Sequence, residues 1–307
     1  MKKRIFALFL SALLLVTVLC ACGDESQSEV GGTGSDGTST SGEAVTGGEL
    51  VVGISQDLGD SLDPYQMTAA GTREVLFNVY EGLVKPTSTG EYVPAVASDS
   101  TVSEDGLTYT FPLREGVLFH NGEEVTTDDV IYSFETCAET TVDTALAAAL
   151  SAVESVTADG NTITVTLSEA NPDFLSYVGM VYIVPDDYTD QATAPVGTGP
   201  FRFVSRSVQQ NLVMEKFADY WGEGASLDKV TFQIFEDSNA LMSALSAESV
   251  DMAVHLTIDQ VNTIGEGTYK TLEGTMNLVQ ALYLNNNVEP FNNEQVRQAL
   301  CYAIDVD

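Results

Sequence analysis

Acid–base and nucleophilic catalysis often depends on histidine, and this 307-residue chain has two, His120 and His255. His120 lies in Phe119-His120-Asn121-Gly122, where we expect a polar turn residue, with a metal ligand as the alternative. His255, within Met252–Leu256, is predicted to be a partly buried structural residue. The sequence contains no HExxH, GxSxG, P-loop or paired CxxC motif. We therefore expect no enzymatic activity, no catalytic residues, no metal site and no cofactor.

Carboxylates are abundant, because 45 Asp and Glu against 12 Lys and Arg give a formal net charge of -33. Adjacent pairs such as Asp128–Asp129 and Glu123–Glu124 do not by themselves indicate two-acid hydrolysis, which depends on a separation in space. A field of this sign repels phosphate backbones, so we expect no nucleic-acid partner. Two interpretations of the acidity stay open: solubility of a surface-exposed protein, or attraction of cationic solutes.

Cysteine chemistry is predicted near the N-terminus. Three basic residues at 2–4 precede an apolar run, 5–19, that is shorter than the roughly 20 residues a spanning helix needs. The run ends in Leu19-Cys20-Ala21-Cys22-Gly23, which resembles the bacterial lipobox. We expect 1–21 to be a lipoprotein signal peptide and Cys22 to be acylated, and the alternative is a plain signal peptide cut nearby. Acylation at Cys22 would anchor the protein to the bacterial cell membrane.

Residues 22–48 are predicted to form a lipid-anchored, flexible tether, because Gly, Ser and Thr dominate and no large apolar residue is present. Ordered structure is expected from Glu49–Ile54, a β-branched run bounded by glycine. The length of the chain favours more than one domain. Cys137 and Cys301 are predicted to be buried small hydrophobic residues, since neither lies in a CxxC.

Hydrophobic periodicity predicts a mixture of helices and strands without strict alternation. Helices are expected at 74–84, 144–153, 237–245 and 296–304, and a further helix through 130–134 is capped by Thr126 or Thr127. Asp237 caps the helix that ends at Leu245, and Asn292 with Gln295 forms the capping box of the last helix. Strands are expected at 107–113, 162–167, 182–184, 212–215 and 230–235.

Short phrases follow one another in a fixed order along the chain. They are Ser61–Pro64, Val79–Val84, Val102–Phe111, Leu113–Val117, Phe119–Gly122, Thr126–Ser133, Gly197–Phe201, Asp219–Gly222, Leu284–Asn285, Pro290–Phe291 and Val296–Leu300. In this order they resemble the family 5 extracellular solute-binding proteins, the oligopeptide and dipeptide binders. Each phrase alone is weak evidence for the family, whereas the ordered series over residues 49–307 is specific to it. The chain departs from the family at Val96–Ser100, where relatives usually have a tryptophan.

The resemblance implies an α/β fold of the type II periplasmic-binding-protein kind, in which two lobes close over a solute. Carried onto this chain, lobe I takes 49–64 and 180–279, an inserted subdomain takes 65–179, and 280–307 begins lobe II. The sequence stops at Asp307, in a phrase resembling the family's Tyr-Ala-Ile-Asp, so the second lobe is expected to be largely missing. We therefore expect this piece alone to bind solute weakly or not at all.

The resemblance also implies a function and a site. We expect an extracytoplasmic, lipid-anchored monomer that captures peptides or similar small solutes for the permease subunits of an ABC importer. The expected ligand-binding residues are Met67, Thr68, Ala69 and Ala70, together with Tyr283 and Asn285; loop or hinge structure is the alternative for each. Family members that bind peptides hold the ligand's amino group with an acidic residue of the second lobe. That part is absent from this sequence, so peptides are the first expectation and nickel chelates, haem and sugars stay open as ligands. A surface hydrolase and an adhesin or sensory module are the rival hypotheses.

Overall fold

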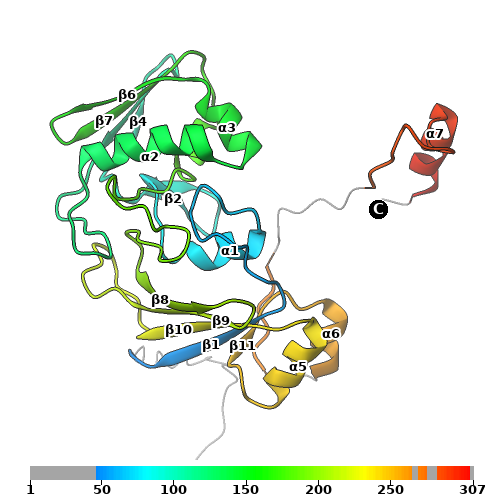
Figure 1. Cartoon of the computed structure of the whole chain (residues 1–307). Coiled ribbons are helices and arrows are strands. Elements are labelled where there is room, and N and C mark those ends of the chain that lie inside the picture. Colours follow the sequence, from blue (N-terminus) through cyan, green and yellow to red (C-terminus); the bar gives the residue numbers. More distant parts are fainter. Residues whose placement is uncertain (1–45, 265–268, 275–281, 305–307) are drawn as a thin grey trace, which may run out of the picture. The chain divides into compact units, whose positions relative to one another are not determined.

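The computed structural model describes residues 46–264, 269–274 and 282–304 (Figure 1). The predicted signal peptide, Cys22 and most of the tether lie outside the described residues, as does Asp307. The described strands form a five-stranded sheet, a four-stranded sheet and a two-stranded hairpin.

The five-stranded sheet combines one strand from the start of the ordered chain with four that come much later. Its bounds are Glu49–Ile54 (β1), Phe201–Ser207 (β8), Asn211–Lys216 (β9), Lys229–Ile234 (β10) and Met252–Ala253 (β11). The strand order is β11-β1-β10-β9-β8, and β1 is parallel to both of its neighbours. Helix α5 (Ser238–Ser246) packs so closely on β1 that a Cβ added to Gly53 would lie 2.2 Å from Leu241 Cδ1.

The four-stranded sheet is antiparallel and is formed by the chain between β1 and β8. Its strands are Thr101–Val102 (β4), Thr108–Pro112 (β5), Val153–Asp159 (β6) and Thr162–Leu167 (β7), in the order β4-β5-β7-β6. Helix α2 (Thr127–Thr140) contacts β6 and β7, and helix α3 (Thr144–Leu150) contacts α2 (Figure 1). Helix α2 begins in a capping box, in which Thr126 and Asp129 each accept a hydrogen bond from the other's backbone N–H.

The remaining elements are short. They are α1 (Ala70–Leu76), α4 (Phe174–Val178), α6 (Ile258–Ile264), α7 (Glu294–Ala303) and the hairpin of β2 (Val84–Pro86) with β3 (Tyr92–Pro94). One apolar cluster joins the two larger sheets, since it contains Val52 and Met214 of the first and Phe111 and Ile163 of the second. A smaller cluster around Leu241 lies beneath α5. The lobe and subdomain boundaries given above stay predictions.

Most of the predicted elements are confirmed. Strands β1, β5, β7, β9 and β10 and helices α2, α3 and α5 lie where hydrophobic periodicity and capping residues placed them, within a few residues at their ends. Asp237 caps α5 as expected, because its Oδ1 accepts hydrogen bonds from the backbone N–H groups of Asn239 and Ala240, both at 2.8 Å.

Four predictions are wrong in detail. The helix expected at 74–84 lies at 70–76, because the following residues from Val79 to Val84 are buried on every side rather than along one helical face. The strand expected at 182–184 is reduced to an isolated bridge between Tyr182 and Gly82. Helix α7 is capped by Asn293, whose side chain accepts from Gln295 N, and not by Asn292. Cys301 is exposed on α7, whereas Cys137 is buried as expected.

Candidate functional site

The carboxyl ends of parallel strands are the usual place for ligands in an open α/β sheet, and β1, β10 and β11 end at one edge of the five-stranded sheet. Gln56 follows β1, and Val254 and His255 follow β11 directly. A hollow of about 160 Å³, called here the strand-end pocket, lies at this edge. Its lining residues are Val52, Ile54, Gln56, Gly71, Glu74, Val75, Phe232, Val254 and His255.

The strand-end pocket has an apolar floor and a polar rim. Side chains from β1 and β10, such as Ile54 and Phe232, form part of the floor, while Gln56, Glu74 and His255 supply the polar groups. Glu74 comes from α1, and its Oε2 lies 2.7 Å from His255 Nε2. The backbone of His255 has a φ of 59°, a left-handed conformation that is uncommon outside glycine. Such backbone conformations cluster at functional sites.

The structure places the predicted segment 67–70 at the start of α1, with Ala70 as the first residue of the helix, and α1 supplies three lining residues of the pocket. Met67 is buried at 2% exposure, and its carbonyl accepts a hydrogen bond from Arg73 Nη2 at 3.2 Å. Thr68 and Ala70 are exposed and Ala69 is partly exposed. All four therefore adjoin the pocket along the chain without lining it. Their assignment as ligand-binding residues stays a prediction.

The other two predicted residues belong to the segment 282–304. The side chain of Tyr283 is almost fully exposed, at 92%, and Asn285 Oδ1 accepts a hydrogen bond from Asn287 N at 3.0 Å. Sequence reasoning missed Gln56 and Glu74 and gave His255 only a structural role. The available signal was positional, because a polar residue directly after a parallel strand lies at the edge of the sheet where ligands bind.

His120 is a partly buried structural residue. Its Nε2 lies 2.9 Å from Gly199 O, and its Nδ1 accepts a hydrogen bond from Gly197 N at 3.3 Å. Burial lowers the pKa of His120 to about 4, so the ring is neutral near pH 7 and Nε2–H is the donor. Within the described residues, no three His, Cys, Asp or Glu side chains gather in a way that could hold a metal ion.

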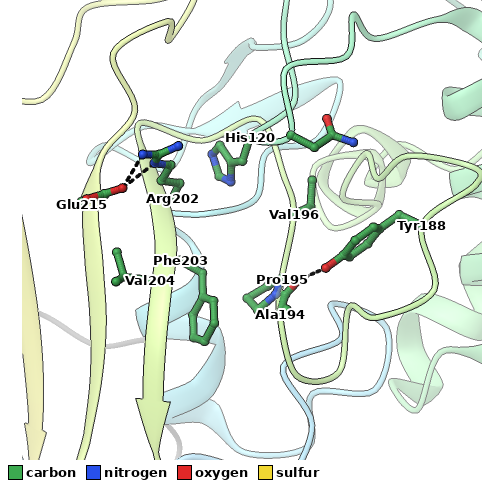
Figure 2. A pocket seen from close by; sticks show the side chains of 10 residues that line it. His120, Tyr188, Ala194, Pro195, Val196, Arg202, Phe203, Val204 and Glu215 are labelled. Atoms are coloured by element: carbon green, nitrogen blue, oxygen red, sulfur yellow. Dashed lines mark hydrogen bonds and ion pairs between the residues drawn. The ribbon is translucent and has the colours of Figure 1, made fainter.

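A larger hollow of about 360 Å³, called here the loop pocket, lies between the loop 188–196 and strand β8 (Figure 2). Its polar groups are already paired, because Arg202 Nη2 lies 2.5 Å from Glu215 Oε1 and the Tyr188 hydroxyl donates to Ala194 O at 2.6 Å. A ligand there would compete with those contacts. The smaller strand-end pocket lies at the carboxyl ends of the parallel strands, the usual place for a ligand, and is the stronger candidate site.

Two phrases of the sequence, Val79–Val84 and Asp219–Gly222, meet in a junction around Glu81, which is only 5% exposed. Its carboxylate accepts hydrogen bonds from the Tyr220 hydroxyl at 2.7 Å and from Trp221 Nε1 at 2.8 Å, and its Oε1 lies 2.8 Å from Lys85 Nζ. Burial and the Glu81 carboxylate raise the pKa of Tyr220 well above its usual value. Residues 140 apart in sequence are thus joined by one buried charge.

A second pair of phrases is joined by close backbone contact. A Cβ added to Gly199 would lie 2.4 Å from Asn78 O, and one added to Gly197 would lie 2.3 Å from Val79 O. Only glycine permits this approach. These contacts join the segment just before β8 to the segment just after α1.

A mixed α/β fold with a hollow at the carboxyl ends of its parallel strands is an arrangement in which proteins of this class bind small ligands. The model of the bacterial extracellular solute-binding proteins, family 5, matches residues 91–307, so the chain belongs to that family. Its fold is accordingly that of the type II periplasmic binding proteins. No helix among the described residues has both the length and the apolar character needed to cross a bilayer.

Relatives with curated names bind different solutes. The chain is 32% identical to heme-binding protein A of Haemophilus influenzae, over 74% of this chain and 47% of that protein. It is 29% identical to the glutathione-binding protein GsiB of Pectobacterium atrosepticum, over 80% of this chain and 50% of that protein. The chain therefore spans about half the length of these curated relatives.

Solved structures show the same likeness. DppA from Helicobacter pylori, in complex with the peptide STSA, matches with 29% identity and a TM-score of 0.72, over 85% of this chain and 57% of that one. NikZ from Campylobacter jejuni, in complex with Ni(L-His), matches with 21% identity and a TM-score of 0.76, over 84% and 53%. The second likeness shows the fold alone.

Proposed function

We propose that the whole protein captures peptides or similar small solutes outside the cytoplasm and delivers them to the permease of an ABC importer. The strand-end pocket is the observation that carries this proposal. Its volume of about 160 Å³ is below the roughly 300 Å³ of a complete ligand pocket, which fits one wall of a site closed by a second lobe. Relatives named for haem, glutathione and peptide binding support solute capture as the shared role.

The proposal includes an anchor and a division of the chain. Acylation of Cys22 would hold the protein on the membrane, and residues 22–48 would hold the binding lobes away from it. Lobe I would take 49–64 and 180–279, the inserted subdomain 65–179, and lobe II would begin at 280. The protein would act as a monomer without enzymatic activity. Loss of labelled fatty acid from a Cys22→Ala variant is the expected result of metabolic labelling.

The ligand can be tested directly. Native mass spectrometry of the protein purified from its own cells is expected to show a retained peptide, which denaturation releases unchanged. A retained nickel complex, haem or sugar would shift the ligand class within the same function. Turnover of the retained solute by the purified protein would contradict the proposal, because a binding protein releases what it took up.

A further inference from the structure

We propose that the strand-end pocket receives a side chain of the solute that has an apolar stem and a cationic head, as in lysine or arginine, with Glu74 as the partner of the cation. This inference rests on the proposed function and adds a ligand class to it.

The shape of the pocket favours one extended side chain. Val52, Ile54, Val75, Phe232 and Val254 present an apolar surface, on which the methylene groups of a lysine or arginine stem would be buried. The polar groups stand together on one side, because Glu74 and His255 are in direct contact at 2.7 Å. A side chain that is apolar along its length and polar at its tip matches this division.

The charge at the rim favours a cation. The lining residues include one carboxylate, that of Glu74, and neither lysine nor arginine. Arg73, the neighbouring base on α1, is already paired, since its Nη1 lies 2.9 Å from Asp143 Oδ2. Among the described residues, Glu74 Oε2 contacts His255 and no donor is found for Oε1. A ligand ammonium or guanidinium group can therefore bind the carboxylate without displacing the imidazole.

The backbone holds His255 in this position. The parallel pairing of β11 with β1 ends at Ala253, and Val254 N donates to Gly53 O at 3.3 Å. The chain then turns at His255 with a φ of 59°, and the ring meets a glutamate that lies 181 residues earlier in the sequence. Left-handed backbone is disfavoured outside glycine, and this conformation is explained if it serves to hold the imidazole against Glu74.

The experiment uses the 307-residue chain, for which weak binding is expected, and follows the imidazole signals of its two histidines in NMR spectra. The probes are the tripeptides Ala-Lys-Ala, Ala-norleucine-Ala and Ala-Glu-Ala, of which the second keeps the stem and removes the charge. We expect Ala-Lys-Ala to shift the His255 signals saturably and to leave the His120 signals in place, because His120 lies outside the strand-end pocket. Its dissociation constant should be about fivefold below that of the norleucine peptide, as for a partly exposed ion pair.

Glu74→Gln is expected to bring the ratio of the two dissociation constants close to one, because it removes the charge and keeps the shape. Glu139→Gln is the matched control, since Glu139 is an exposed residue of α2 and makes no ion pair with a described residue. The fivefold ratio should persist in that control.

The outcomes separate this inference from the proposed function. Equal binding of all three peptides, or a lysine preference that survives Glu74→Gln, would overturn the cationic preference and leave solute capture standing. If the protein purified from its own cells retains a solute but His255 responds to none of the peptides, the location of the binding site at the strand-end pocket would be overturned. Absence of any retained solute from the protein purified from its own cells would instead count against the proposed function.

Discussion

Replacing Glu81 by Gln should destabilise the protein far more than the same replacement at Glu215. Both carboxylates have a basic partner, Lys85 or Arg202, and both substitutions remove one negative charge while keeping nearly the same volume. The two sites differ in burial, because the Glu81 side chain is 4% exposed and the Glu215 side chain is 41% exposed. The pair of variants therefore isolates the effect of burial on one chemical change.

The magnitude follows from the contacts of Glu81. In Gln one acceptor oxygen becomes an NH₂ donor, so either Trp221 Nε1–H or the Tyr220 hydroxyl loses its acceptor, at a cost of about 1–3 kcal/mol. Breaking a fully buried ion pair costs about 3–5 kcal/mol, but Lys85 is 32% exposed and can turn to water. We expect a loss of about 2–3 kcal/mol for Glu81→Gln and less than about 1 kcal/mol for Glu215→Gln.

Urea unfolding gives both values. Trp221 is the only tryptophan of the chain, so its fluorescence reports on the junction, and circular dichroism should give the same midpoint if unfolding is two-state. A free energy of unfolding for Glu81→Gln equal to that of Glu215→Gln would refute the reasoning. It would mean that the buried carboxylate contributes no more than an exposed one.

Three further predictions follow from other contacts. Gly199→Ala should lower the melting temperature by several degrees or prevent folding, since its Cβ would meet a backbone oxygen at 2.4 Å, whereas Gly224→Ala should be neutral because its nearest neighbour is a lysine side chain at 3.6 Å. Burial lowers the pKa of His120 from 6.5 to about 4, so between these pH values the histidine is protonated in the unfolded state and neutral in the folded state. The free energy of unfolding should therefore fall by up to about 3 kcal/mol as the pH falls through this range. His120→Gln should flatten this slope, and His255→Gln should not. Burial raises the pKa of Cys137 to about 12, so a thiol reagent should modify Cys301 in the native protein and Cys137 only after unfolding, as located by mass spectrometry.

Local signals made most of the secondary structure predictable. Thr126 and Asp237 cap their helices through contacts with residues two or three positions away, which the sequence displays directly. The phrase around Glu81 misled the prediction, because its apolar spacing imitates a helix while the chain there is surrounded on all sides. The prediction that Cys301 is buried was wrong for a related reason, because the apolar spacing of α7 does not show which face of the helix is covered.

The contact between Glu74 and His255 in the candidate site could not be predicted from such local signals. Glu74 and His255 are in contact because β11 pairs with β1, and the residues next to either of them in the sequence do not indicate a partner 181 positions away. The family phrases gave the fold class, which the family match and the solved relatives confirm. They pointed to segment 67–70, which adjoins the strand-end pocket, and they did not point to the residues that line it.

In this chain the phrases that carry the family resemblance are separate from the residues that line the strand-end pocket. The phrases that carry the resemblance, such as those containing Glu81 and Gly199, build the junction between distant parts of the chain. None of the nine residues that line the strand-end pocket belongs to a phrase. Under the proposed role of the pocket, substitution at Glu74 or His255 changes the preferred solute without disturbing the packing around Glu81 and Gly199. Ligand identity is accordingly best sought with probes designed for Glu74 and His255, rather than with the ligand of any one relative.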